Sequence, residues 1–281
     1  MTSPGWERIR LGDQECLRVV FPEPLEGHLR AYFVLKGPWT AGTCGNPEEI
    51  LKRSRDLRSS EPDLPERWIA PVQRHGIDIL QGDRASVLPL RPDGDGVFLK
   101  TPGTGLLLRY ADCVPVLLAG RLPRPWALGL HAGYAGVTED LVGAGFERLF
   151  GHEGQDEEDL WAWIGPGIGK CCYVRDEDDP GTARGKRRLP PACWDEEEGG
   201  KVRFDLKGAL RLQLRRHVPE ERIFDCALCT AHEGAHCLSY RRGDQEDRMA
   251  LLAWIHRCIP PFQATSPAFE GKKKAEGTPS P

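Results

Sequence analysis

The feature that most restricts the fold of this chain is a series of short apolar runs in its middle third. Each run is of strand length and is bounded by glycine, proline or charged residues, which favours strands over helices. The runs occupy residues 106–108, 114–118, 126–130 and 160–164. We therefore expect residues 71–170 to supply most of the strands of a buried core.

The run at 114–118 begins in an unusual way. Asp112 and Cys113 precede it, and Pro115 interrupts it. Because proline cannot donate a ladder hydrogen bond, Pro115 predicts a local sheet edge or a bulge. An acid and a thiol at the mouth of a buried strand stand where a reactive group can be held rigidly and still reach solvent.

Composition allows a large core and argues against two classes of partner. The chain has 281 residues, 40% of them hydrophobic, and a formal net charge of -4. This charge gives no general attraction to nucleic acid or to an anionic membrane. The longest apolar runs also fall far short of the roughly 20 residues that span a bilayer. We expect neither nucleic acid nor a membrane as a partner.

The ten cysteines bear on the compartment. The N-terminal stretch MTSPGWERIRLGDQE contains no apolar signal segment, so the sequence does not indicate secretion. We expect a reducing, cytoplasmic setting in which the cysteines are free, catalytic or bound to metal. Most of them are expected to be small core residues.

The flanking regions carry weaker patterns. Residues 16–21 and 28–35 look like strands, and the polar residues 47–57 look helical. Residues 204–218 predict a helix that Asp205 caps, with leucines at four-residue spacing.

Charge and composition suggest how the chain is divided. Residues 174–201 are densely charged and rich in proline and glycine, which predicts an exposed excursion rather than a domain boundary. The polar residues 263–281 predict a disordered tail. We expect a single domain over residues 1–262.

Three segments place a histidine or a cysteine at the end of an apolar run. They are QRHG at 73–76, YADC at 110–113 and HAGYAG at 131–136. His75, Cys113 and His131 form a plausible catalytic zinc set whose fourth position is left for water or substrate. The competing interpretation is a core cysteine and two histidines satisfied by backbone groups, because the spacing matches no compact zinc motif.

The small residues of HAGYAG allow two interpretations. They let the backbone approach a ligand closely, and a helix that begins near Val137 would offer free N–H groups to an anion. The acids Glu139 and Asp140 would compete with that anion. A tight turn from strand to helix explains the motif equally well.

Two further groups have polar or thiol side chains. The adjacent Arg241 and Arg242 suit phosphate or oxyanion binding, although an exposed turn is the plainer interpretation. Cys226 and Cys229 form a C-x-x-C pair close to His232, His236 and Cys237, which invites a second zinc site. However, Phe224, Cys226 and Leu228 alternate as in a strand, which places Cys226 and Cys229 on opposite faces. We therefore favour a structural role for this pair, and for Cys171 and Cys172.

Taken in order, these motifs resemble a known family. The series is QRHG at 73–76, ADCVPVLL at 111–118, HAGYAG at 131–136, IGPGIG at 164–169, CT at 229–230, SYRR at 239–242 and GDQEDRMALLAWI at 243–255. It resembles the YfiH-like family, also called the laccase-domain or polyphenol-oxidase-like family, over about residues 70–256. Members of that family are described as zinc-dependent purine nucleoside phosphorylases with adenosine deaminase side activity.

The resemblance implies a fold and a ligand set. The implied fold is α+β, with mixed β-sheets layered between helices (αββα) rather than a doubly wound parallel sheet. The implied metal ligands are His75, Cys113 and His131, with Zn²⁺ favoured over copper. The chain departs from the family pattern in three places. Tyr134-Ala135 replaces Trp-Arg, residues 33–47 match the R-x-G-G-V-S segment poorly, and Asp247-Arg248 replaces Gly-Arg.

The leading hypothesis is a zinc-dependent phosphorylase of adenosine-, inosine- or methylthioadenosine-type nucleosides, with purine nucleoside and phosphate as its partners. Arg74, Arg241 or Arg242 would orient the phosphate, and Tyr134 would stack on the base. In a deaminase reaction, zinc-bound hydroxide would attack the purine ring. Asp112 would then be a proton shuttle or a group that orients a histidine ligand.

Three alternatives compete with this hypothesis. One is a metal-free hydrolase with Cys113 as nucleophile and His131 or His75 as base. Another is copper-dependent phenol oxidation, although the sequence shows no multi-copper set of histidines. The last is a degenerate, non-catalytic member, which the loss of arginine at Ala135 would explain. The sequence does not indicate an oligomeric state.

Overall fold

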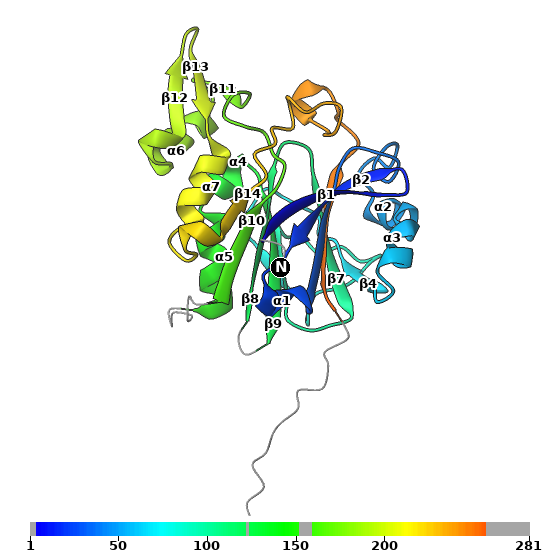
Figure 1. Cartoon of the computed structure of the whole chain (residues 1–281). Coiled ribbons are helices and arrows are strands. Elements are labelled where there is room, and N and C mark those ends of the chain that lie inside the picture. Colours follow the sequence, from blue (N-terminus) through cyan, green and yellow to red (C-terminus); the bar gives the residue numbers. More distant parts are fainter. Residues whose placement is uncertain (1–3, 122–123, 152–158, 257–281) are drawn as a thin grey trace, which may run out of the picture.

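The structure is a computed structural model that describes residues 4–121, 124–151 and 159–256. Two six-stranded sheets pack face to face, and helices cover their outer faces (Figure 1). This confirms the predicted α+β fold with mixed sheets between helical layers. The tail over 263–281, which we expected to be disordered, lies outside the described residues. None of the helices in the described ranges is long and apolar enough to cross a membrane.

The first sheet joins the two ends of the chain. Its strand order is β1-β2-β3-β15-β7-β4, so the last strand lies between β3 and β7. All of its pairings are antiparallel except that of β4 with β7. The strands are β1 (Gly5–Leu11), β2 (Gln14–Val20), β3 (Leu29–Val34), β4 (Arg67–Ile69), β7 (Thr104–Tyr110) and β15 (Met249–Ile255).

The second sheet holds the apolar runs after residue 110. Its order is β14-β10-β8-β9-β6-β5, with parallel pairs at the two edges and antiparallel pairs between them. The strands are β5 (Ile79–Gln81), β6 (Gly96–Leu99), β8 (Val114–Arg121), β9 (Pro125–Ala132), β10 (Leu160–Ile164) and β14 (Ile223–Asp225). All four predicted runs are therefore strands, and they lie at or next to the centre of a sheet.

Burial on both faces explains why these strands look so uniformly apolar. Along β8, Val116 and Leu118 point to the helices while Leu117 and Ala119 point to the other sheet. Truncating a side chain such as Leu117 to alanine removes packing worth about 2–5 kcal/mol of unfolding free energy.

Helices cover both outer faces. Leucines of α5 and α7 share a core cluster with β8, while Ile50 of α2 and Leu57 of α3 share another with Trp254 of β15. The helices are α1 (Glu23–Glu26), α2 (Pro47–Arg53), α3 (Arg55–Ser60), α4 (Tyr134–Thr138), α5 (Leu141–Phe150), α6 (Pro180–Arg188) and α7 (Leu206–Leu214), with 3₁₀ turns η2 (Pro191–Cys193), η3 (Glu220–Arg222) and η4 (Tyr240–Arg242).

Two helical predictions are confirmed with small changes. The Asp205 carboxylate caps α7 by accepting a hydrogen bond from the N–H of Gly208. The segment predicted at 47–57 forms two helices, because the chain breaks at the buried Ser54.

Although β8 is central in its sheet, Pro115 lies at a local edge, as the sequence predicted, because β8 pairs with only one neighbouring strand at this residue. Pro115 is the second residue of β8 and lies opposite His131. On the other side, pairing with β10 starts only at Val116. Proline is tolerated there because it stands where the ladder with β10 has not yet begun.

The charged excursion is more ordered than expected. It contains α6 and most of a three-stranded sheet of order β11-β13-β12, which projects from the sandwich (Figure 1). These strands are β11 (Val174–Asp176), β12 (Trp194–Glu197) and β13 (Lys201–Phe204). Many of its charges are exposed and paired, for example Lys186 with Glu177. Its inner residues, however, reach the pocket described below.

Candidate metal centre and pocket

Three potential metal ligands, His75, Cys113 and His131, meet at one end of the second sheet, and we call them the His–Cys–His site. Cys113 immediately precedes β8 and His131 is the next-to-last residue of β9. Because Val114 pairs with Ala132, the start of β8 and the end of β9 lie side by side. The donor atoms of the three side chains all lie within 4.8 Å of one another.

Asp95 holds the site together. Its carboxylate lies 2.8 Å from Nδ1 of His131 and accepts hydrogen bonds from the backbone N–H groups of Arg74, His75 and Gly76. Burial favours the neutral acid, but the hydrogen bonds from His131, Gly76 and His75 lower the pKa of Asp95 below its ordinary value. One buried carboxylate therefore orients one histidine and fixes the loop that carries the other.

Close backbone approach is also required at Gly133. A Cβ atom there would lie 2.7 Å from Cδ2 of His75 and 3.1 Å from Sγ of Cys113. A larger residue would push two ligands apart, so the first glycine of HAGYAG makes room for the site itself.

The three side chains fit a divalent transition metal. Two imidazoles and one thiolate are a zinc-type donor set, and the contact of His131 Nδ1 with Asp95 leaves Nε2 as the ligand atom. Burial raises the pKa of the Cys113 thiol to about 12, and Asp112 and Asp95 contribute to this. Burial also lowers the pKa of His131.

A pocket of about 740 Å³ opens above the site. Arginine and tyrosine side chains form much of its lining, and the charged excursion over 174–201 contributes Arg175, Gly181 and Arg184. The lining residues are Gln73, His75, Arg109, Ala111, Asp112, Cys113, His131, Tyr134, Ala135, Thr138, Glu139, Tyr173, Arg175, Gly181, Arg184, Tyr240, Arg241 and Arg248.

The pocket arginines differ in how far they are already engaged. Arg109 donates to the carbonyls of Gly45 and Pro71 and to Gln73, and burial lowers its pKa to about 10. Arg184 pairs with Glu139. Arg241 donates one hydrogen bond to the Val174 carbonyl, at 2.7 Å, and lies over the Tyr173 ring.

Asp112 ties three segments together. This residue has a positive φ of 84°, and its carboxylate accepts hydrogen bonds from the Thr230 hydroxyl at 2.6 Å and from the Arg241 backbone N–H at 2.8 Å. Its own carbonyl accepts from the Ile168 N–H. The carboxylate that orients a histidine ligand is Asp95, whereas Asp112 fixes the loops around the pocket.

The structure brings together most of the side chains that the sequence singled out. His75, Cys113, His131, Asp112, Tyr134 and Arg241 all line the pocket. Arg74 and Arg242 are not among the lining residues. Arg74 pairs with Asp93 in an exposed position, and Arg242 donates to the Ala231 carbonyl.

Sequence reasoning missed several residues of the site. Asp95, Arg109 and Arg248 stand in or next to apolar strands, where a lone charge is the only available signal. Arg175 and Arg184 were hidden among the many charges of the excursion. They line the pocket because β11, which carries Arg175, and α6, which carries Arg184, lie beside it.

This fold and site define a class: an α+β sandwich with a three-ligand candidate metal centre at its strand ends. The chain belongs to the family described as multi-copper polyphenol oxidoreductase laccase, whose model matches residues 40–256. The resemblance drawn from the motifs to the YfiH-like family is confirmed, since relatives and solved structures bear that name.

Two curated relatives illustrate the similarity. Purine nucleoside phosphorylase YlmD of Geobacillus stearothermophilus is 34% identical over 239 residues, which cover 79% of this chain and 85% of that protein. Purine nucleoside phosphorylase YfiH of Escherichia coli strain K12 is 27% identical over 212 residues, covering 75% of this chain and 84% of that protein.

Solved structures agree with the fold. The crystal structure of YlmD from Geobacillus stearothermophilus superposes with a TM-score of 0.68 at 29% identity, covering 92% of this chain and 97% of that one. The crystal structure of the Bacillus licheniformis hypothetical protein YfiH gives a TM-score of 0.72 at 25% identity, covering 87% and 98%.

Proposed function

We propose that this protein is a zinc-dependent purine nucleoside phosphorylase. The observation that carries the proposal is the meeting of His75, Cys113 and His131 at the base of a pocket of about 740 Å³ with several cationic and aromatic walls. A pocket of this size suits a nucleoside and a phosphate. The names of the relatives support the same activity.

His75, Cys113 and His131 would hold the metal. When bound, a divalent ion with an open position supplies Lewis-acid stabilisation of developing negative charge. The histidine and thiol donors suit zinc, and copper is the competing ion. In the described part of the chain, the histidines near the pocket do not form a multi-copper arrangement, which disfavours phenol oxidation.

Arginines of the pocket would bind and orient the phosphate. The side chains of Arg241 and Arg248 each donate hydrogen bonds to backbone carbonyls through Nη1, while a guanidinium carries five N–H donors. Both side chains can therefore offer a charge-assisted contact to a phosphate oxygen. Holding phosphate in line with the sugar carbon lowers the barrier by removing the entropy cost of a bimolecular encounter.

Tyrosines would bind the base. Tyr134, Tyr173 and Tyr240 all line the pocket, and Tyr240 is 53% exposed. Tyr134 is held in place because its hydroxyl donates to the Gly181 carbonyl at 2.9 Å and Arg175 covers its ring at 4.2 Å. A purine can stack on such aromatic faces.

The family's arginine is replaced by Ala135 in this chain, but the pocket still has other cations. Arg175 and Arg184 of the excursion line the same pocket as Ala135. Cations from another segment at the pocket favour a catalytic member over a degenerate one, although Arg175 pairs with Asp179 and Arg184 with Glu139. Asp112 acts in this proposal as a positioning residue, because it ties Arg241 to the turn before β8.

Deamination of adenosine is the second activity to test, because three protein ligands leave a coordination position where water can be activated. The experiment incubates purified protein of known metal content with adenosine or inosine, with and without phosphate. Phosphate-dependent release of free base supports the phosphorylase, and ammonia from adenosine supports the deaminase.

The same assay separates the alternatives. Turnover that persists after complete metal removal would favour a hydrolase with Cys113 as nucleophile. Bound copper with oxygen consumption on phenols would favour the oxidase. One metal ion at the site with no turnover on a nucleoside panel would overturn the proposal in favour of a non-catalytic member.

A further inference from the structure

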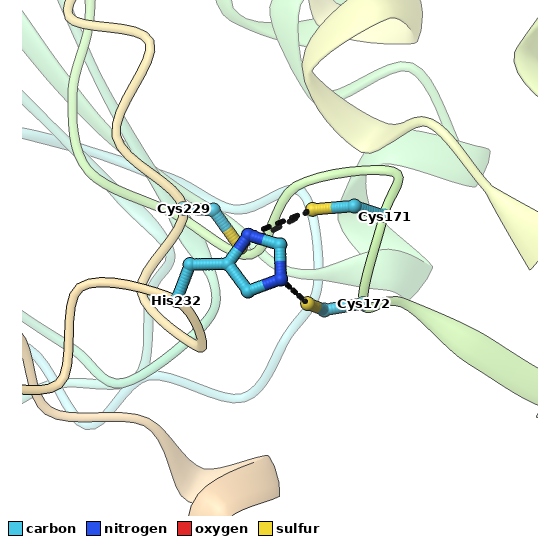
Figure 2. A group of neighbouring side chains, drawn as sticks. All are labelled: Cys171, Cys172, Cys229 and His232. Carbon is cyan, nitrogen blue, oxygen red and sulfur yellow. Dashed lines mark hydrogen bonds between the residues drawn. The ribbon is translucent and has the colours of Figure 1, made fainter.

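A second group of potential metal ligands lies outside the pocket. Cys171, Cys172, Cys229 and His232, which we call the cysteine-rich cluster, point toward one another from two loops (Figure 2). Their donor atoms all lie within 4.8 Å of one another. None of the four lines the pocket.

The grouping differs from the one that the sequence suggested. The C-x-x-C spacing pairs Cys229 with Cys226, but Cys226 packs against the core between the sheets, and its backbone N–H donates to the Ile164 carbonyl. The structure instead places Cys229 beside Cys171 and Cys172. Our interpretation of these two cysteines as merely structural did not anticipate this arrangement.

Two tight turns build the cluster. In the first, the N–H groups of Cys172 and Tyr173 donate to the Gly169 carbonyl. In the second, the N–H groups of His232 and Glu233 donate to the Cys229 carbonyl. A β-bridge between Gly167 and Cys229 joins the two segments. The four side chains are therefore set by backbone structure.

Two of the separations, those of Cys171 from Cys229 and from Nδ1 of His232, match those around a tetrahedral zinc ion. Sγ of Cys171 lies 3.7 Å from Sγ of Cys229 and 3.5 Å from Nδ1 of His232, and Sγ of Cys172 lies 3.3 Å from Nε2 of His232. Zinc–ligand bonds of about 2.3 Å to sulfur and about 2.0 Å to nitrogen place tetrahedral ligands about 3.5–3.8 Å apart. The ion takes only one of the two ring nitrogens. If it takes Nδ1, Sγ of Cys172 has to turn from Nε2 toward the ion, from a donor separation that is already within 4.8 Å.

Gly169 contacts two of the cysteines in the cluster through its backbone. Its backbone N–H donates to Sγ of Cys229 at 3.2 Å. A Cβ atom at this position would lie 3.2 Å from both Sγ of Cys171 and Cβ of Cys229. N–H donors of this kind orient and stabilise thiolate ligands, so this glycine gives the cluster both a donor and the space it needs.

We propose that the cysteine-rich cluster binds one zinc ion through the three thiolates and one nitrogen of His232. Four protein ligands close the coordination sphere, so the ion has a structural role. A disulfide between Cys171 and Cys229 is the competing state, but its bond of about 2.05 Å needs the sulfurs to approach further and leaves Cys172 and His232 without a role.

The site joins two walls of the pocket. Cys171 and Cys172 precede Tyr173 and Arg175, while Cys229 and His232 precede Tyr240 and Arg241. Arg241 spans the two segments, because its side chain donates to the Val174 carbonyl. The bound ion fixes the loops that position these pocket residues.

The test counts metal in the full chain, purified with reductant and without chelator. We expect two zinc ions per chain in the wild type, one in Cys171→Ser and one in Cys113→Ala. The thiol controls Cys44→Ser and Cys226→Ser keep two, since neither belongs to a cluster. Circular dichroism of each variant checks that it is folded.

Cobalt substitution of the wild type tests the ligand set without relying on variants. A site with three thiolates gives much stronger sulfur-to-cobalt charge transfer than a site with one, so we expect two binding steps of unequal intensity. A zinc content that does not fall in Cys171→Ser, whether the wild type holds one ion or two, or a Cys171–Cys229 disulfide in the reduced preparation would overturn the proposal. None of these readouts depends on the nucleoside activity.

Discussion

The His–Cys–His site and the cysteine-rich cluster are both groups of soft or borderline ligands, yet they are built in different ways. The first has three potential ligands, two of them at the ends of paired central strands, and lies at the base of a large pocket. The second has four ligands, is set by two turns and lies outside that pocket. Three ligands leave a position open for chemistry, and four leave none. The number of potential ligands and the access to them thus distinguish the proposed catalytic centre from the proposed structural one.

The largest expected difference between the two groups is catalytic. Replacing one ligand of the His–Cys–His site, as in Cys113→Ala, should lower kcat/KM for phosphorolysis about 10³-fold, because bound metal contributes several kcal/mol to transition-state stabilisation. Steady-state kinetics with inosine and phosphate measure this. Cys171→Ser loses a metal ion too but should keep most of its activity. Equal losses in the two variants would contradict the distinction.

The second prediction concerns how the first site is supported. Asp95→Asn should weaken metal affinity at the His–Cys–His site about 10–100-fold, because the carboxylate orients His131. Competition with a chromogenic chelator measures the affinity of each site. Asp93→Asn is the matched control, since Asp93 is exposed and pairs with the exposed Arg74. A loss confined to the cysteine-rich cluster would show that Asp95 has been misassigned.

The adjacent residues Arg241 and Arg242 extend the comparison, because the first lies at the pocket and the second beside the cysteine-rich cluster. Arg241 lines the pocket, whereas Arg242 contacts Ala231 in the turn of the cysteine-rich cluster. Arg241→Gln should raise KM for phosphate about tenfold, the effect of one charge-assisted hydrogen bond of roughly 1.5 kcal/mol. Arg242→Gln should leave this KM unchanged. Phosphate titrations at saturating inosine distinguish the two variants.

The two regions also differ in how much of them the sequence predicts. Cys113 and His131 stand at the ends of two apolar runs that are close in the chain and pair as neighbouring strands, so a local pattern can bring them together. His75 lies in a loop that Asp95 fixes, and the sequence does not show that contact. The cysteine-rich cluster depends on two turns far apart in the chain, which no local pattern relates. The C-x-x-C spacing pointed to Cys226, and the alternation that rightly set Cys226 apart from Cys229 gave no sign of the partners that Cys229 has instead.

The charged residues also differ in whether the sequence predicts their role. Asp205 was predicted as a helix cap because capping is local, and the structure confirms it. Asp95 and Arg175 act through neighbours that only the tertiary fold supplies. Local chemistry is therefore visible in a single sequence, whereas partnerships across elements are not.

The smallest expected effect tests whether the two regions communicate. His232→Ala should remove one zinc ion and lower the melting temperature, since an ion bound only by the folded state stabilises it by mass action. Its effect on the pocket should be slight, because Asp112 still ties Arg241 and Thr230 to the turn before β8. We expect KM for inosine to rise about two- to fivefold, or roughly 0.5–1 kcal/mol, with kcat nearly unchanged. His236→Ala is the matched control, because His236 lies outside the cluster and pairs with Glu15. A large fall in kcat with KM unchanged would mean that the cluster takes part in the chemistry, and the division between catalytic and structural centres would then fail.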